Sequence, residues 1–371
     1  MSGLVELATV TRFLNKPDIP HARQGRTMLK NTIRKLLVIT GFLVLLYCGA
    51  ALTMVFWPVP KFAHPFAFST QTATQTHTVA PATPNAEAIQ FHMRDGAVLR
   101  AAKFGQNAPE TILFLHGVLA SSDQYLETCS QLHILTGDKV IALDLRGHGK
   151  SDGVPGDIRY IGQYEDDVAD VLKQITDKQP GSRIILAGHS MGGGIVMRYA
   201  ALHLKPAADG YLLFAPHLGI KSPTMRLGPA PWSVTAGEPL AKLDLPRVLG
   251  LVMLNPIGMR WFNGLDTLFF NVPAQFPIHA YSFRAMVSMT PDSHIAALTA
   301  DRTPLLVIVG SKDEVFYADR FASVINLHQN SKTVLVDGPT HDGIVHSAAA
   351  LSAAADWIRQ TRQPIRSAVA L

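Results

Sequence analysis

The chain has 371 residues, 47% of them hydrophobic, and its 33 lysines and arginines exceed its 28 aspartates and glutamates by five. Seven of the basic residues and two of the acidic ones lie in residues 1–35, so the remaining 336 residues hold 26 of each sign and are neutral. A hydrophobic, electrically balanced body excludes a disordered chain, and it lacks the basic surface that binding to nucleic acid requires.

The first predicted element is an apolar segment without charged residues at positions 36–57. At about 1.5 Å per residue it would form a helix of roughly 33 Å, enough to cross a hydrocarbon core of about 30 Å. The alternatives are a buried core helix and a cleaved signal peptide, whose apolar region normally has only about 7–15 residues. We expect a single membrane anchor. Because basic residues precede it in 1–35, the positive-inside rule predicts a cytoplasmic N-terminus and an extracytoplasmic body.

Residues 58–86 are rich in Pro, Thr, Ala and Gln and almost free of charge, which is typical of a flexible linker. We therefore expect a linker between the anchor and a globular domain at residues 87–371. The two cysteines, Cys48 and Cys129, lie on opposite sides of this linker and are not expected to form a disulfide, so they do not indicate a compartment.

Apolar runs of strand length recur through the globular region, at residues 111–117, 139–145, 183–190, 210–216, 304–311 and 332–338. The runs are continuous instead of alternating, which is typical of strands buried on both faces of a parallel sheet. Residues 160–175 and 191–204 show helical spacing, and residues 87–104 have the pattern of a hairpin. The sequence therefore predicts an α/β fold with a mostly parallel central sheet and helices on both faces.

A stretch of 87 residues, 217–303, separates the fourth apolar run from the fifth. Unstructured loops of that length are uncommon inside compact domains, so we expect an inserted helical cap at about residues 217–300. Its aromatic residues either form the core of the cap or line an apolar channel beside the chemistry. These residues are Trp232, Trp261, Phe262, Phe269, Phe270 and Phe276.

The apolar run at 183–190 leads directly into Gly188-His189-Ser190-Met191-Gly192 and then into a predicted helix. A Gly-X-Ser-X-Gly turn between strand and helix exposes the serine in a strained backbone conformation. Glycines are needed two residues before and after it, because side chains there would collide. Ser190 is therefore the candidate nucleophile, with Gly188 and Gly192 completing the nucleophile elbow.

A serine hydroxyl needs a general base, and the base needs a carboxylate that orients it. His341 follows the last predicted strand, at the sheet edge where α/β proteins place their ligands and chemistry. Asp313 follows the preceding strand at the same edge, and the chain order Ser190, Asp313, His341 is the one expected for this fold. The alternatives are His346 for the base, and Glu314 and Asp337 for the acid.

The stretches FLHGVLASSDQY, DLRGHGKSDG, AGHSMGGGI, GSKDEVF and GPTHDGI resemble the α/β-hydrolase superfamily. The resemblance is to its monoacylglycerol lipase and lysophospholipase branch, which is grouped with serine aminopeptidase-type hydrolases. It covers about residues 88–360 and is weakest across the cap. It implies an oxyanion hole formed by the backbone N–H groups of Val118 and Met191. It also implies structural, non-catalytic roles for loop residues His116, Asp144, Arg146 and His148.

The resemblance and the apolar segments predict a membrane-anchored serine hydrolase that cleaves carboxylic esters through an acyl-enzyme. An apolar cap and an anchor favour a single-chain lipid substrate such as a monoacylglycerol or lysophospholipid. Acyltransferase, thioesterase and aminopeptidase chemistry on the same triad stay open. The cap holds six basic residues against four acidic ones, which disfavours binding of a peptide amino terminus. A non-catalytic binding protein is disfavoured because all three triad positions are intact. The sequence has no metal-ligand cluster or nucleotide-binding motif, so we expect no metal and no cofactor.

Overall fold

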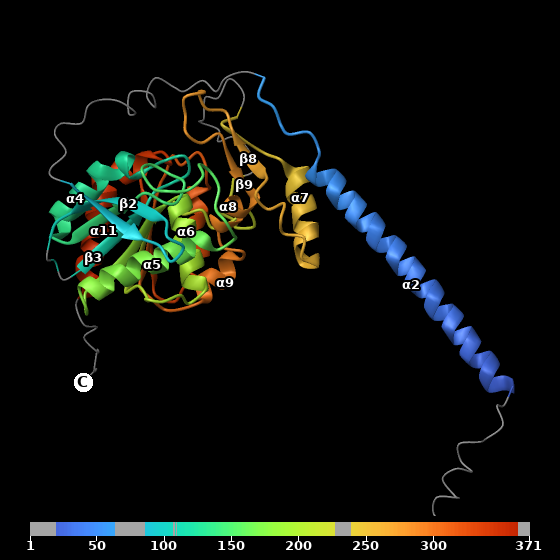
Figure 1. Cartoon of the computed structure of the whole chain (residues 1–371). Helices are drawn as coiled ribbons and strands as arrows, with labels where there is room; N and C mark the ends of the chain where they lie inside the picture. The colour runs from blue at the N-terminus through green and yellow to red at the C-terminus, as the bar shows by residue number, and fades with distance from the viewer. Residues whose placement is uncertain (1–19, 64–85, 107, 109, 227–238, 363–371) are drawn as a thin grey trace, which may run out of the picture. The chain divides into compact units, whose positions relative to one another are not determined.

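The computed structural model of the protein describes residues 20–63, 86–106, 108, 110–226 and 239–362 (Figure 1). The chain divides into two compact units. We call Met1–Pro58 with Pro246–Arg260 the long-helix unit, and Val59–Leu245 with Trp261–Leu371 the sheet unit. Most of the linker expected at residues 58–86 lies outside the described residues, and so does Trp232 of the expected cap.

An eight-stranded sheet forms the centre of the sheet unit, in the order β1-β2-β4-β3-β5-β6-β10-β11. β1 and β2 form an antiparallel hairpin, β2 is antiparallel to β4, and the pairs from β4 to β11 are parallel. The predicted hairpin and the mostly parallel sheet are confirmed. The strands are β1 Glu87–His92, β2 Val98–Phe104, β3 Glu110–Leu115, β4 Lys139–Leu143, β5 Arg183–His189, β6 Gly210–Phe214, β10 Leu305–Gly310 and β11 Ser331–Val336.

The central strands are buried along nearly their whole length, and every residue of β3, β6 and β10 is buried. Helices cover both faces of the sheet: α4 packs with α11 on one face, and α5 packs with α6 on the other (Figure 1). This two-sided cover explains why the strands lack an alternating polar pattern. The helices are α4 Leu126–Thr136, α5 Gln163–Lys178, α6 Met191–Ala201 and α11 Ala348–Arg362, with shorter turns η1 Ser122–Tyr125, η3 Ala318–Arg320, α10 Phe321–Ile325 and η4 Gly343–His346.

The insertion between β6 and β10 contains strands as well as helices, so the prediction of a helical cap is incomplete. A small antiparallel sheet, in the order β7-β8-β9, is formed by β7 Ala241–Leu243, β8 Asp266–Phe270 and β9 Ala280–Ser282. Strands of three to five residues are too short for a period of two to stand out in the sequence. The helical elements are α7 Leu245–Leu254, η2 Asn255–Ile257, α8 Phe283–Ser288 and α9 His294–Thr299.

A partly buried ion pair and a hydrogen bond from a buried arginine attach the sheet-unit part of the insertion to the main fold. Arg284 donates two hydrogen bonds to Asp157, at 2.8 and 2.5 Å. Arg198 of α6 pairs with Glu165 of α5 and donates to the carbonyl oxygen of Thr290 at 3.0 Å. Because both arginines join the insertion to the neighbourhood of α5 and α6, it is held as part of the body.

The long-helix unit begins with α2 Pro20–Val55, which starts 16 residues before the predicted span and ends two residues before its predicted end. Its segment Met28–Val55 is long and apolar enough to cross a membrane, and only 6% of its most apolar stretch is buried. A helix with these properties near the N-terminus fits a membrane anchor or a signal sequence.

Candidate active site

The candidate nucleophile lies at a strained turn between β5 and α6. Ser190 has φ 50° and ψ −112°, a conformation that is unfavourable for a residue with a side chain. Backbone hydrogen bonds hold it there. Its N–H donates to the carbonyl oxygen of Phe214, and its carbonyl oxygen accepts from the N–H groups of Gly194 and His217, each at 3.0 Å. The neighbouring strand β6 and the segment after it therefore fix the turn.

The elbow glycines are required by the packing. A Cβ on Gly188 would lie 2.5 Å from the carbonyl carbon of Gly192, and a Cβ on Gly192 would lie 2.2 Å from the carbonyl oxygen of Leu115. Both contacts are with backbone, which cannot move aside cheaply. Side chains at these two positions would therefore collide with the backbone, as the sequence predicts.

The structure brings Ser190, His341 and Asp313 together at the carboxyl edge of the sheet. His341 Nε2 lies 2.9 Å from Ser190 Oγ, and His341 Nδ1 lies 2.9 Å from Asp313 Oδ2. All three side chains are buried, and Asp313 is inaccessible to solvent. The other oxygen of Asp313 accepts hydrogen bonds from the N–H groups of Val315 and Phe316, at 2.8 and 2.7 Å. The carboxylate is therefore held in the orientation that meets the imidazole ring.

The alternative acids and base have other partners. Glu314 Oε2 accepts a hydrogen bond from the backbone N–H of His341 at 2.9 Å, so it fixes the loop and not the ring. Asp337 accepts from the hydroxyl of Ser311 at 2.9 Å. His346 is exposed in η4. The geometry consequently favours Asp313 and His341 for the two roles.

His341 is the histidine at this edge whose charged form is stabilised. Burial alone would lower its pKa, but the charge of Asp313 and the hydrogen bond to it outweigh burial, so the pKa of His341 is raised above its ordinary value of 6.5. Burial lowers the pKa of His189 and of His217 to about 4, and a positive charge on His341 adds to this effect. At neutral pH His189 and His217 are thus neutral, and His341 is the ring suited to take up a proton.

The expected oxyanion donors are the backbone N–H groups of Val118, in the loop after β3, and Met191, the first residue of α6. Within the part of the chain that the structure describes, neither N–H has a hydrogen-bond acceptor. The N–H of Met191 also points from the amino end of a helix, where the helix dipole favours negative charge. These donors are therefore available to a ligand.

Two tyrosine–histidine pairs hold the loop on either side of Val118. The N–H of Gly117 donates to the hydroxyl of Tyr125 at 3.0 Å, and that hydroxyl lies 2.8 Å from His189 Nδ1. His189 Nε2 lies 3.1 Å from the carbonyl oxygen of His341, so Nε2 carries the proton and Nδ1 accepts from Tyr125. This first pair links the loop to the segment that carries the base.

The second pair reaches the loop from the insertion. The N–H of Leu119 donates to the hydroxyl of Tyr281 in β9 at 3.0 Å, and this hydroxyl lies 2.7 Å from His148 Nε2. His148 Nδ1 lies 2.9 Å from the carbonyl oxygen of Arg146, so Nε2 is the acceptor and Tyr281 is the donor. Leu119 has a φ of 59°, a conformation that is strained for a residue other than glycine. The hydrogen bond to Tyr281 helps to hold Leu119 in this conformation.

Sequence reasoning did not identify Tyr125, His189 or Tyr281. Tyr125 and His189 lie inside the quoted motifs, so their positions beside the loop and the nucleophile were a usable signal. Tyr281 lies in the insertion, where the resemblance is weakest, and its sequence neighbours give no signal. The contact depends on a strand pairing that only the structure shows.

The residues expected to fix loops do so. Asp144 accepts hydrogen bonds from the N–H groups of Ser122 at 2.6 Å and Lys150 at 2.9 Å. Arg146 donates two hydrogen bonds to Asp167. His116 Nε2 accepts from the N–H of Leu145 at 3.1 Å, and burial lowers the pKa of His116 to about 4. These contacts lie beside the triad without reaching its reacting atoms.

One group of side chains in the described residues has the spacing of a metal site. Ligand atoms of His189, His341 and Asp342 lie within 4.8 Å of one another. The ring nitrogens of both histidines are already engaged, those of His341 by Ser190 and Asp313 and those of His189 by Tyr125 and a carbonyl oxygen. The arrangement is therefore satisfied as a hydrogen-bond network.

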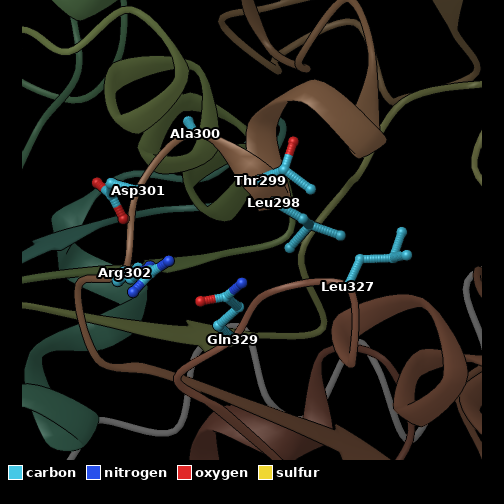
Figure 2. A pocket seen from close by; sticks show the side chains of 7 residues that line it. All are labelled: Leu298, Thr299, Ala300, Asp301, Arg302, Leu327 and Gln329. Carbon is cyan, nitrogen blue, oxygen red and sulfur yellow. The ribbon is translucent and has the colours of Figure 1, made fainter.

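A pocket of about 300 Å³ lies at the other edge of the sheet (Figure 2). Its side chains precede β10 and β11, at the amino ends of parallel strands, whereas the triad residues follow the carboxyl ends. The pocket is consequently separate from the candidate active site. Its lining residues are Leu298, Thr299, Ala300, Asp301, Arg302, Leu327 and Gln329.

Residues 106–257 match the family described as "Serine aminopeptidase, S33". The strand order, the elbow and the position of the triad are those of the fold to which that family belongs. The chain has the α/β-hydrolase fold, and its sequence is similar to that family. This α/β hydrolase is 27% identical over 217 residues to a monoacylglycerol lipase of Mycolicibacterium smegmatis, covering 54% of this chain and 71% of the lipase.

Other similarities to this α/β hydrolase are shorter or more distant. A non-heme haloperoxidase of Rhodococcus erythropolis is 38% identical over 111 residues, which cover 29% of this chain and only 37% of the haloperoxidase. The crystal structure of a membrane phospholipase A, described as a bacterial virulence factor, superposes with a TM-score of 0.52. The superposition covers 91% of this chain and 100% of the phospholipase chain, at 18% sequence identity. This similarity shows a shared fold. In sequence and architecture, the hydrolase is of the esterase and lipase type.

Proposed function

We propose that the protein hydrolyses carboxylic esters with Ser190 as nucleophile, His341 as general base and acid, and Asp313 as the residue that orients His341. The observation that carries this proposal is the pair of 2.9 Å contacts that join the three side chains at the strained turn. Ser190 Oγ attacks the ester carbonyl while His341 Nε2 takes its proton, and His341 then protonates the leaving alcohol. Water, activated by the same ring, releases the acid from the acyl-enzyme.

The negative charge on the carbonyl oxygen in the tetrahedral intermediate would be bound by the N–H groups of Val118 and Met191. Gly192 supports this role because it lets the start of α6, which carries the N–H of Met191, approach the backbone of Leu115 and His116 at the end of β3. Gly188 supports it because it lets β5 approach the backbone of Gly192. A single donor of this kind typically contributes about 2.7–4 kcal/mol of transition-state stabilisation. No cofactor or metal takes part in the proposed reaction.

We further propose a lipid-like substrate with a single acyl chain, such as a monoacylglycerol or a lysophospholipid. The similarity to a monoacylglycerol lipase supports this proposal, as does the apolar helix α2. In the proposed organisation, residues 1–35 are cytoplasmic, residues 36–57 anchor the chain, residues 58–86 link, and residues 87–371 form the extracytoplasmic hydrolase domain with its insertion at about 217–300. The partners are the ester substrate and the lipid bilayer.

The test is a substrate panel on the full chain in detergent or lipid discs, comparing the native protein with Ser190→Ala. Loss of the nucleophile is expected to lower kcat by at least about 10⁴-fold and to abolish labelling by a fluorophosphonate probe. The panel contains lysophospholipids, monoacylglycerols, short p-nitrophenyl esters, thioesters and aminoacyl amides. Esterase activity that survives in Ser190→Ala would refute the proposed nucleophile, and preferred cleavage of amides or thioesters would redirect the substrate assignment.

A further inference from the structure

Helix α7 lies inside the long-helix unit, although in sequence it belongs to the insertion. It runs antiparallel to the C-terminal part of α2, as three contacts show. Arg247 Nε donates to the carbonyl oxygen of Val55 at 2.9 Å, and the hydroxyl of Tyr47 donates to the carbonyl oxygen of Met253 at 2.8 Å. Between them, a Cβ on Gly250 would lie 2.5 Å from the carbonyl oxygen of Ala51. The two helices therefore meet backbone to backbone.

The contacts on α2 lie inside the segment proposed to cross the membrane. Tyr47 to Val55 are the last nine residues of the helix and cover roughly 12 Å of its length. The ten residues of α7 extend over about 15 Å, which is half of a hydrocarbon core of about 30 Å. If α2 spans the bilayer, α7 must lie at the depth of the leaflet that holds the C-terminal end of α2.

The composition and pattern of α7 fit that depth. Its sequence LPRVLGLVML contains one charged residue, Arg247, placed near the end of α2 and of the proposed span. Gly250, Leu251 and Leu254 are buried, and the opposite face is formed by the exposed side chains of Leu249 and Val252. A helix that is apolar on all sides is suited to a protein core or to lipid. Among the described residues, none buries the side chains of Leu249 and Val252.

Three polar side chains of α2 and of the α7–η2 segment have hydrogen-bond partners, as polar groups need in the hydrocarbon core of a bilayer. A tyrosine hydroxyl within an apolar span is costly unless it is bonded, and that of Tyr47 bonds a carbonyl oxygen in the last turn of α7. The side-chain amide of Asn255 donates to the carbonyl oxygen of Leu251 at 2.7 Å, and the hydroxyl of Thr53 donates to that of Gly49 at 2.8 Å. Close packing at a glycine is also characteristic of helix pairs in membranes.

From this geometry we propose that α7 is a re-entrant helix that enters the leaflet beside α2 and contacts lipid acyl chains through its exposed face, Leu249 and Val252. This inference rests on the proposed anchor. We assign lipid as the occupant of that face because α7 packs along α2, whose own exposed side chains are apolar. Leu45 of α2 is 72% accessible and Val252 of α7 is 52% accessible. β7 ends two residues before α7 begins, so the insertion itself would be attached to the bilayer surface.

The experiment places a nitroxide label at Val252→Cys in the full chain, reconstituted in phosphatidylcholine/phosphatidylglycerol vesicles, in a Cys48→Ala background. Cys129 is buried and burial raises the pKa of its thiol, so it stays unlabelled. Collision rates with oxygen, which partitions into lipid, and with a water-soluble nickel chelate are measured. Leu45→Cys reports on the span, and Ile295→Cys, exposed on α9, reports on water. Turnover of a short soluble ester shows that each variant is folded.

We expect the oxygen-to-nickel ratio at Val252→Cys to match that at Leu45→Cys and to exceed that at Ile295→Cys by at least about fivefold. A water-like ratio at Val252→Cys with a lipid-like ratio at Leu45→Cys overturns the inference while the anchor stands. Shielding of Val252→Cys from both reagents would show that protein, such as a second copy of the chain, covers the face, and this also overturns it. A water-like ratio at Leu45→Cys would refute the anchor itself. Leu249→Cys repeats the measurement on the same face if Val252→Cys fails to fold.

Discussion

The nucleophile elbow and the crossing of α2 with α7 use the same steric device for different ends. In both, a glycine lets backbones approach more closely than any side chain would allow: a Cβ would lie 2.2 Å from Leu115 at Gly192 and 2.5 Å from Ala51 at Gly250. Around the elbow, directed hydrogen bonds hold the backbone of Ser190 and the three side chains, whereas apolar side chains dominate around the crossing. At the elbow, the close approach of two backbones fixes the positions of the reacting atoms. At the crossing, the same close approach brings two apolar helix surfaces together.

The largest expected loss of activity follows from a change at Asp313, the carboxylate that pairs with His341. Asp313→Asn keeps the shape but removes the charge that orients and stabilises His341, so we expect kcat to fall by about 10³–10⁴-fold. The base must be neutral to act, so activity in the native protein is lost as pH falls through the raised pKa of His341. The acid limb of kcat/KM should therefore lie above pH 6.5 in the native protein. It should move to lower pH in Asp313→Asn, where burial dominates.

A methyl group at the elbow should have the next largest effect. Gly192→Ala forces the start of α6 away from β3 and moves the N–H of Met191, so we expect a loss of about 10²–10³-fold in kcat with a smaller change in KM. The matched control is Gly49→Ala, because a Cβ on Gly49 meets nothing within 4 Å. Equal kcat in Gly192→Ala and the native enzyme would contradict the assigned donor.

A smaller loss of kcat is expected at Tyr281, the residue of the insertion that supports the loop carrying Val118. Tyr281→Phe leaves the N–H of Leu119 and His148 Nε2 without their partner, and an unsatisfied buried group costs about 1–3 kcal/mol. We expect kcat to fall about tenfold for short and long esters alike, because the loop carries Val118 and not a substrate subsite. Tyr211→Phe is the control, since the hydroxyl of Tyr211 bonds Asp301 at the opposite edge of the sheet. A loss confined to long esters would instead assign Tyr281 to substrate binding.

The smallest effect on catalysis is expected at the helix crossing. Gly250→Ala should leave turnover of a short soluble ester within about twofold, since exposed or apolar sites away from the chemistry rarely affect it. It should separate α7 from α2, and we expect a longer or broader spin–spin distance between labels at Cys48 and Val252→Cys. Gly49→Ala should leave this distance unchanged. An unaltered distance in Gly250→Ala would show that the close approach does not hold the pair together.

The parts of the fold that could be predicted from sequence are those with a strong local pattern. The six continuous apolar runs gave six parallel strands, each within two residues at its ends. Burial on both faces of the central strands favours such continuous apolar sequences. The triad residues could be nominated because each follows the carboxyl end of a strand. What failed depends on contacts between distant segments. The three short strands of the insertion have no readable period, and Tyr281 reaches Leu119 only through the pairing of β8 with β9.

The same limit applies to α7. Its apolar sequence was visible as part of the insertion, but a ten-residue apolar helix is equally suited to a protein core. Only the positions of Gly250 and Tyr47 relative to the other helix distinguish the two cases, and nothing in the sequence connects residues so far apart. Contacts of that kind require the structure.

The hydrogen bond from Tyr47 to Met253 joins residues 206 positions apart in the chain. A ribosome that adds about 5–20 residues per second needs roughly 10–40 s to synthesise the intervening segment. Throughout that interval α2 exists without α7, and β1 to β6 are made before its partner appears. The surface around Ala51 and Val55 thus stays uncovered until α7 has been made. During biogenesis it is open to other helices or to chaperones, and the order of synthesis makes closure of the pair a late step in maturation.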